Sequence, residues 1–255
     1  MRIDKYLVGK YFSSRTKAAR AISEGLVKRN GKTALPSDEV KPDDLIEVME
    51  KTVSFVSEGG FKLDKALSDF GDDVKNLIFA DIGASTGGFT DCLLQRGAKR
   101  VYAIDVGESQ LDNSLVSDER IVVMDNTNAR YLSASDFQSV LDGIVADVSF
   151  ISLKYLMPVI SALLNNSGCA YLLIKPQFEC GRSALDKHGI VKDMRLRKKA
   201  ILDVVANGEL FGLFAVNVTE APIKQNKNVE YVVKFVKSDI KLNNETFKKS
   251  FNFLK

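Results

Sequence analysis

Short apolar runs alternate with helix-length segments along most of the chain, from about residue 60 to residue 236. Turn-forming residues bound each run, which is typical of buried strands joined by helices. Repeated strand–helix units predict an α/β fold, a doubly wound Rossmann-like sheet with right-handed crossovers. The loop 220–228 is too short for a crossover helix, so the last two strands are expected to be antiparallel. The seven predicted strands are 77–82, 100–105, 121–124, 143–147, 169–174, 213–219 and 230–236.

The first 50 residues follow a different pattern, in which helix-forming segments precede strand-forming ones. A helix is predicted over 15–22, where a stripe of alanine and isoleucine can pack inward. Asn30-Gly31 is the strongest short signal for a β-hairpin. This pattern predicts a small α+β domain with its own core. The predicted boundaries are 1–50 for this domain, 51–57 for an interdomain linker and 58–255 for the larger domain.

Composition narrows the class of protein. The chain is 45% hydrophobic and 27% charged, as is usual for a globular protein. It has no run of 18 apolar residues and no apolar signal core near its start, so we expect a cytoplasmic protein without a membrane span. The three cysteines, Cys92, Cys169 and Cys180, are few and widely spaced. They fit reduced thiols better than a disulfide or zinc framework, and no metal site is predicted.

The net charge of +3 is unevenly distributed. Residues 2–32 hold nine basic and two acidic side chains, a net of +7, which leaves −4 for the rest of the chain. A basic face on a small separate domain is typical of nucleic-acid binding, although a solvated helix surface is the simpler alternative. The residues predicted to contact RNA are Arg2, Lys5, Arg15, Lys17, Arg20, Lys28 and Arg29.

A glycine-rich loop follows the first strand of the larger domain. A dinucleotide fingerprint would need glycine in place of Ser85, and a phosphate-binding P-loop would need lysine in place of Phe89. The pattern Asp-x-Gly-x-x-x-Gly-Gly is instead typical of enzymes that bind S-adenosylmethionine. The loop residues predicted to bind this cofactor are Asp81, Gly83, Ala84, Ser85, Thr86, Gly87, Gly88 and Phe89.

Acidic residues end the next strands of the predicted sheet. Asp105 follows Gly83 by 22 residues and can accept both hydroxyl protons of an adenosine ribose. Asp125 ends the following strand and is expected to reach the adenine. Aspartate is also common in turns, which would explain either residue alone. The series of acids at successive strand ends favours the cofactor site.

Four charged residues are expected at one edge of the predicted sheet. Asp147 and Lys175 each end a buried strand. Glu230 opens the last strand, and Lys62 lies just before an expected helix. Ligands of open α/β sheets bind beyond the carboxyl ends of the strands, so these charges suggest one site. A structural ion-pair network is the alternative.

The chain resembles the TlyA family, known both as haemolysins and as ribosomal RNA 2′-O-methyltransferases. Residues 1–50 resemble the S-four-type RNA-binding module. The other matching segments are Gly59–Leu63, Asp81–Asp91, Asp147–Leu153, Leu173–Glu179 and Asn228–Tyr231. The resemblance implies an FtsJ-like, class I methyltransferase domain that uses S-adenosylmethionine and methylates ribose hydroxyls of cytidines in ribosomal RNA.

The resemblance also implies a catalytic tetrad of Lys62, Asp147, Lys175 and Glu230. Lys175 is expected nearest the 2′-hydroxyl, the two acids are expected to orient the lysines, and Asp147 is also expected to touch the methionine part of the cofactor. Two other functions compete with this hypothesis. A membrane-active haemolysin would need an amphipathic or spanning segment, and none is evident. A noncatalytic RNA-binding or ribosome assembly factor would not need the tetrad.

Overall fold

The computed structural model describes residues 1–255 except 13, 24, 50–53, 223–226, 241, 243–244, 253 and 255, and describes only the backbone of 17, 20, 245 and 246. The described chain divides into two compact units, Met1–Ser54 and Phe55–Lys255. The predicted boundary at residue 50 and the first part of the predicted linker, 51–53, lie outside the described residues.

The first unit has the predicted order of helices followed by strands. Its three short strands form an antiparallel sheet of order β2-β1-β3. Asn30 and Gly31 have φ of 51° and 76°, the conformation that a two-residue hairpin of type I′ requires. The predicted hairpin is therefore confirmed. The elements are α1 (Ile3–Tyr6), α2 (Arg15–Ser23), β1 (Val27–Arg29), β2 (Lys32–Thr33) and β3 (Ile46–Val48).

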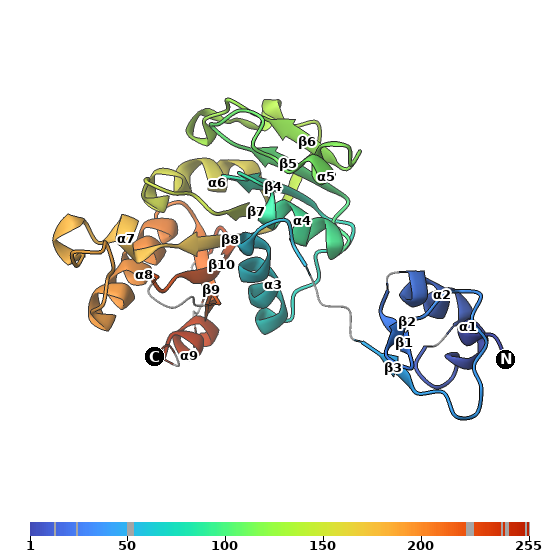
Figure 1. Cartoon of the computed structure of the whole chain (residues 1–255). Helices are drawn as coiled ribbons and strands as arrows, with labels where there is room; N and C mark the ends of the chain where they lie inside the picture. The colour runs from blue at the N-terminus through green and yellow to red at the C-terminus, as the bar shows by residue number, and fades with distance from the viewer. Residues whose placement is uncertain are drawn as a thin grey trace. The chain divides into compact units, whose positions relative to one another are not determined.

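The second unit is built on a seven-stranded sheet of order β6-β5-β4-β7-β8-β10-β9 (Figure 1). Neighbouring strands from β6 to β8 are parallel, whereas β10 is antiparallel to both β8 and β9. The predicted α/β class and the antiparallel last pair are thus confirmed. The strands are β4 (Ile78–Ile82), β5 (Arg100–Ile104), β6 (Ile121–Met124), β7 (Leu141–Ala146), β8 (Leu164–Ile174), β9 (Leu213–Glu220) and β10 (Tyr231–Lys237).

Helices cover both faces of this sheet because successive residues of each strand point to opposite sides. Phe79 of β4 packs with α3 and α4, whereas Ala80 packs in a second core with α6, α8 and α9. The α-helices are α3 (Glu58–Phe70), α4 (Gly88–Gln95), α5 (Asn113–Val116), α6 (Met157–Leu163), α7 (Pro176–Glu179), α8 (Met194–Glu209) and α9 (Glu245–Asn252). The 3-10 helices are η1 (Ala129–Tyr131), η2 (Ala134–Asp136), η3 (Leu153–Tyr155) and η4 (Arg182–Ala184).

The strand order reverses between β4 and β7, since the chain runs outward through β5 and β6 and then returns to start β7 on the other side. Such a switch point leaves a crevice beyond the carboxyl ends of the two strands, where open α/β sheets bind their ligands. Because β10 runs against β8, its first residues lie at this same edge, with Tyr231 paired to Ile174. The edge therefore gathers the ends of β4, β7 and β8 and the start of β10.

The position expected for Lys62, just before a helix, is wrong. Lys62 lies inside α3, which already begins at Glu58. Two glycines near the start of a helix argue against helix formation on propensity alone. Tertiary packing overrides that preference here, because a Cβ on Gly60 would lie 2.3 Å from the ring of Phe55. The glycines allow α3 to pack tightly enough to bring Lys62 to the sheet edge.

Candidate active site

The glycine-rich loop joins β4 to α4 and packs against the end of β7. Gly83 has a φ of 80°, and a Cβ there would lie only 2.9 Å from the carbonyl oxygen of Asp147. Gly87, with a φ of 93°, caps the start of α4. Glycine adopts positive φ without steric cost and permits the close backbone approach. The loop therefore presents backbone rather than bulky side chains at the switch point.

Two adjoining cavities flank this loop. The larger, of about 470 Å³, lies between the ends of β4 and β5 and the segment that follows β7. The smaller, of about 180 Å³, lies between the loop and the start of α3 and includes Asp81 and Lys175 in its walls. Both are lined by Gly83, Ser85 and Asp147. Of the residues predicted to bind the cofactor, Gly87 and Asp125 alone line neither cavity.

The acids at the ends of β5 and β6 hold backbone segments in place. The carboxylate of Asp105 accepts hydrogen bonds from the backbone N–H groups of Ser85 and Gly107, both at 2.8 Å, and it lines the larger cavity. A carboxylate has about four lone-pair sites, so it can accept further hydrogen bonds from a ligand. Asp125 accepts from the N–H of Ser109 at 2.9 Å. Its predicted contact with adenine stays a prediction.

Asp81 is fully buried at the end of β4. Its Oδ2 accepts a hydrogen bond from Thr90 Oγ1 at 2.6 Å, while its Oδ1 has no described partner. The pKa of Asp81 is raised to about 7, mainly by burial, which the hydrogen bond from Thr90 partly offsets and to which the negative charge of Asp147 adds. Asp81 thus provides an unpaired acceptor in the wall of the smaller cavity, where a cationic group would hold it ionised.

The structure brings the four charged residues of the predicted tetrad together. Lys62 Nζ lies 2.6 Å from Glu230 Oε2 and 4.0 Å from Asp147 Oδ2. On the other side, Lys175 Nζ lies 2.6 Å from Asp147 Oδ1, an ion pair without the angle of a hydrogen bond. Asp147 therefore bridges the two lysines. All four side chains are 10–21% exposed, which leaves them largely shielded yet open to a ligand.

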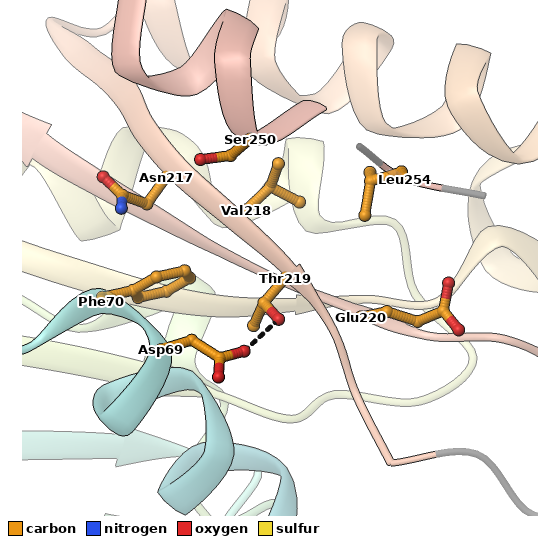
Figure 2. Close-up of a pocket in the computed structure, with 8 residues that line it drawn as sticks. All are labelled: Asp69, Phe70, Asn217, Val218, Thr219, Glu220, Ser250 and Leu254. Atoms are coloured by element: carbon orange, nitrogen blue, oxygen red, sulfur yellow. Dashed lines mark hydrogen bonds between the residues drawn. The ribbon is translucent and has the colours of Figure 1, made fainter. Parts of the chain in front are cut away.

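A third cavity, of about 390 Å³, lies between the end of α3, β9 and α9 (Figure 2). Thr219 donates a hydrogen bond to Asp69 there at 2.5 Å. Its lining residues include none of those that line the two cavities at the glycine loop. Strand β9 is separated from β8, which carries Lys175 at its end, by β10. This cavity is therefore not part of the candidate active site.

Comparison with known families matches both units. The FtsJ-like methyltransferase family model matches residues 55–237, and the S4 domain family model matches residues 1–46. The chain belongs to the FtsJ-like methyltransferases. S-adenosylmethionine is the methyl donor of such an enzyme, and the two cavities fit it. They combine a glycine loop, an acid able to accept from ribose hydroxyls and a buried unpaired carboxylate oxygen.

Several relatives of this FtsJ-like methyltransferase are similar over most of its length. Hemolysin A of Brachyspira hyodysenteriae is 43% identical over 92% of this chain and 100% of its own. The 16S/23S rRNA (cytidine-2′-O)-methyltransferase TlyA of Mycobacterium tuberculosis is 38% identical over 90% of this chain and 87% of its own. A solved structure from Streptococcus thermophilus, provisionally named a hemolysin, has a TM-score of 0.74 at 35% identity, covering 99% of this chain and 94% of that one.

Membership of the TlyA group, inferred from the sequence, is thus confirmed. Some relatives carry the name hemolysin. Among the described residues, no helix has both the length and the apolar character that crossing a membrane requires.

Ser149 and Glu179 are among the residues at or beside this site that the sequence did not predict. Ser149 accepts a hydrogen bond from Lys175 Nζ at 2.8 Å and lines both cavities. Glu179 accepts two hydrogen bonds from the segment that follows β7. Both residues lie within segments that resemble the TlyA family. Their contacts could not be predicted, because these contacts depend on how two neighbouring loops meet.

The predicted RNA-binding arginines of the S4 domain are partly paired with acids. Arg2 and Arg15 lie 3.3 and 2.9 Å from Asp4, and Arg29 lies 2.7 Å from Asp44. Burial alone would raise the pKa of Asp4, but the hydrogen bond and charge of Arg15 lower it overall. A guanidinium has five N–H donors, so a paired arginine retains donors for phosphate. Arg2 and Arg15 are also 55% and 59% exposed.

The predicted RNA-binding lysines are less uniform. Lys5 is exposed and Lys28 is half-buried in β1. The side chains of Lys17 and Arg20 lie outside the described residues. The RNA contacts expected of these residues stay predictions.

The buried Asp81 makes stability depend on pH. Its pKa is about 7 in the fold and near 3.8 in the unfolded chain, so between these values the folded state keeps a proton that the unfolded state releases. Stability therefore falls as pH rises from about 4 to about 7.

Replacement of Asp81 by asparagine removes this pH dependence. The free energy of unfolding of Asp81→Asn, relative to that of wild type, is expected to rise by on the order of 3 kcal/mol as the pH increases from 4 to 8. Urea unfolding at both pH values measures this change. The exposed Asp73→Asn is the control, and a pH-independent difference for Asp81→Asn would contradict the assignment.

Proposed function

We propose that this protein transfers a methyl group from S-adenosylmethionine to ribose 2′-hydroxyls of cytidines in ribosomal RNA. The observation that carries the proposal is a chain of ion pairs beside the glycine loop. Its nitrogen–oxygen distances are 4.0 Å or less, and it links Lys62, Asp147, Lys175 and Glu230. Two lysines next to a methyl-donor site suit an acceptor oxygen that becomes negative as it reacts.

The donor is expected to lie across the two cavities at the glycine loop. S-adenosylmethionine, when bound, supplies an electrophilic methyl group on a sulfonium. The carboxylate of Asp105 is positioned to accept hydrogen bonds from ribose hydroxyls at the wall of the larger cavity. In the smaller cavity, Asp81 and Asp147 provide carboxylate oxygens for a cationic amino group. These contacts would direct the donor toward Lys175.

The acceptor hydroxyl is expected to lie against Lys175. The cationic Nζ stabilises negative charge on the oxygen and thereby lowers its affinity for its proton. Ser149 and Asp147 hold Nζ in place, at 2.8 and 2.6 Å. Lys62, held by Glu230, fixes the other side of Asp147. Alignment of two reactants in such a fixed site can account for roughly 7–11 kcal/mol of the barrier.

An aromatic side chain stands at the mouth of the site. Phe150 follows Ser149 directly, is 91% exposed and lines the larger cavity. Exposed aromatic rings stack on unpaired bases, which is the usual way that proteins hold single-stranded RNA. A ribose within a duplex is hard to align, so the target nucleotide is expected to leave its stack. Phe150 is placed to receive its base.

The class of RNA is supported by the S4 domain and by the relatives. The excess of basic side chains in residues 2–32 of the first unit suits a polyanion, and the Mycobacterium tuberculosis relative is named for cytidine 2′-O-methylation of 16S and 23S rRNA. We extend that substrate to this protein. The activity is assigned to the cytoplasm, where ribosomal RNA is modified and where its three free cysteines would remain reduced.

Mass-spectrometric mapping of ribosomal RNA tests this function. Purified protein with labelled S-adenosylmethionine is expected to add methyl groups to the ribose of specific cytidines in unmodified ribosomal subunits or RNA. Methylation confined to bases, or none on any ribosomal substrate, would refute the proposal. A vesicle-leakage assay on the same preparation distinguishes a membrane-active protein, and RNA binding without methyl transfer distinguishes a noncatalytic factor.

A further inference from the structure

The loop that follows β7 and the turn that follows β8 are joined at a second place besides the tetrad. Glu179 ends α7, the short helix that begins directly after Lys175. Its Oε2 accepts a hydrogen bond from Ser152 Oγ at 2.6 Å, and its Oε1 accepts from the backbone N–H of Leu153 at 2.9 Å. Both carboxylate oxygens are thus used to hold the far end of the β7 loop.

The residue between these two attachments has a strained backbone. Phe150 has a φ of 64°, which a bulky side chain adopts only where its surroundings fix it. Its ring meets that of Phe178 on α7, with centroids 5.2 Å apart. Ser149 on one side is held by Lys175, and Ser152 on the other is held by Glu179. The strained conformation is therefore fixed from both ends by groups of the β8–α7 segment.

We propose that Glu179 is a positioning residue of this enzyme, which fixes Ser149 and Phe150 relative to Lys175. The inference rests on the proposed function, in which Lys175 and Phe150 contact the target nucleotide. Without Glu179, the loop would lose the two hydrogen bonds that hold Ser152 and Leu153, and Phe150 would be free to relax to negative φ. Its ring would then leave the mouth of the site, and Ser149 would no longer hold Lys175 Nζ in one position.

The chemistry of the contact distinguishes two substitutions. Glu179→Ala removes both acceptors. Glu179→Gln can keep both contacts, because its oxygen can accept from the N–H of Leu153 while its NH₂ donates to Ser152 Oγ, which can also accept. If Glu179 acts by holding the loop in position, Glu179→Gln is expected to retain the activity that Glu179→Ala loses. If Glu179 acts through its negative charge, both variants are expected to lose activity.

The first test is steady-state kinetics of the full-length variants on ribosomal RNA. Glu179→Ala is expected to lower kcat about 10- to 100-fold, the effect of misplacing a reacting group by about 1 Å. Its affinity for S-adenosylhomocysteine, measured by calorimetry, is expected to fall less than kcat does, because the glycine loop and Asp105 are untouched although the loop after β7 also lines the larger cavity. Glu179→Gln is expected to stay within about threefold of wild type in kcat.

A matched control separates position from stability. Asp118 likewise accepts hydrogen bonds on both carboxylate oxygens, from the side chain of Arg120 at 2.6 and 2.9 Å and from its backbone N–H at 2.9 Å, but it lies before β6. Asp118→Ala is expected to leave kcat unchanged at a temperature where each variant is folded. A wild-type kcat for folded Glu179→Ala, or an equal loss in Glu179→Gln, would overturn the proposal.

Hydrogen exchange provides a readout that does not depend on activity. Residues 147–155 are expected to exchange faster in Glu179→Ala than in wild type, Glu179→Gln or Asp118→Ala. Equal exchange in Glu179→Ala and wild type would overturn the inference. If wild type methylated no ribosomal RNA but the expected exchange pattern were found, the proposed function would fail while the positioning of the loop would stand.

Discussion

Replacement of Lys175 by alanine is expected to lower the rate of methyl transfer at least about 10³-fold. The side chain of Lys175 is 10% exposed and lies where the carboxyl edge of the sheet meets the smaller cavity. It is the tetrad member that contacts both Asp147 and Ser149. Its removal would delete the charge that stabilises the acceptor oxygen and leave the carboxylate of Asp147 without its nearer partner.

Donor binding should survive this substitution. Most of the larger cavity, including Asp105 and the glycine loop, does not involve Lys175. Single-turnover transfer of a labelled methyl group measures the rate, and calorimetry with S-adenosylhomocysteine measures donor affinity. Lys65→Ala is the matched control, because Lys65 lies on α3 and pairs with Asp69, away from the tetrad. Substantial residual turnover in Lys175→Ala would remove Lys175 from the mechanism.

Deletion of residues 1–50 is expected to weaken RNA binding at least about 100-fold while leaving donor affinity nearly unchanged. The first unit has its own hydrophobic core, and its basic side chains are concentrated in residues 2–32. Each phosphate neutralised by a lysine or arginine releases counterions, so the affinity contributed by this unit should fall steeply with salt. Fluorescence anisotropy with a ribosomal RNA fragment at several salt concentrations measures both effects.

A charge variant of the full chain tests the same prediction without removing a domain. Lys5→Glu combined with Lys28→Glu is expected to make the slope of log RNA affinity against log salt concentration shallower by about one to two units. Lys99→Glu is the control, because Lys99 is exposed just before β5, at the opposite edge of the sheet from the tetrad. Equal RNA affinity for the truncated and full-length proteins would refute the role of the S4 domain.

The strands could be predicted because their residues are buried on both faces of the sheet and therefore form continuous apolar runs. Asp147 and Lys175 follow such runs directly, so their place at one edge followed from topology alone. Glu230 needed one more step. It lies at that edge only because β10 is antiparallel, which the short connection to β9 indicated.

The helix around Lys62 could not be predicted in the same way, because its first turn contains two glycines. These glycines leave room for the rings of Phe55 and Phe89, which pack closely against the helix. Only the folded structure shows that these rings lie there. Ser149 and Glu179 were missed for a related reason. Each acts across the gap between two loops, and no periodicity links residues 26 or 27 positions apart.

The ion pair between Lys62 and Glu230 joins residues 168 positions apart, from the first helix of the catalytic unit to the start of its last strand. During synthesis, the glycine loop and Asp105 leave the ribosome long before Glu230 does. A chain that ends before residue 230 lacks one of the four residues of the predicted tetrad. The predicted tetrad is therefore complete only once β10 has joined the sheet between β8 and β9, as the last step in the order of the chain.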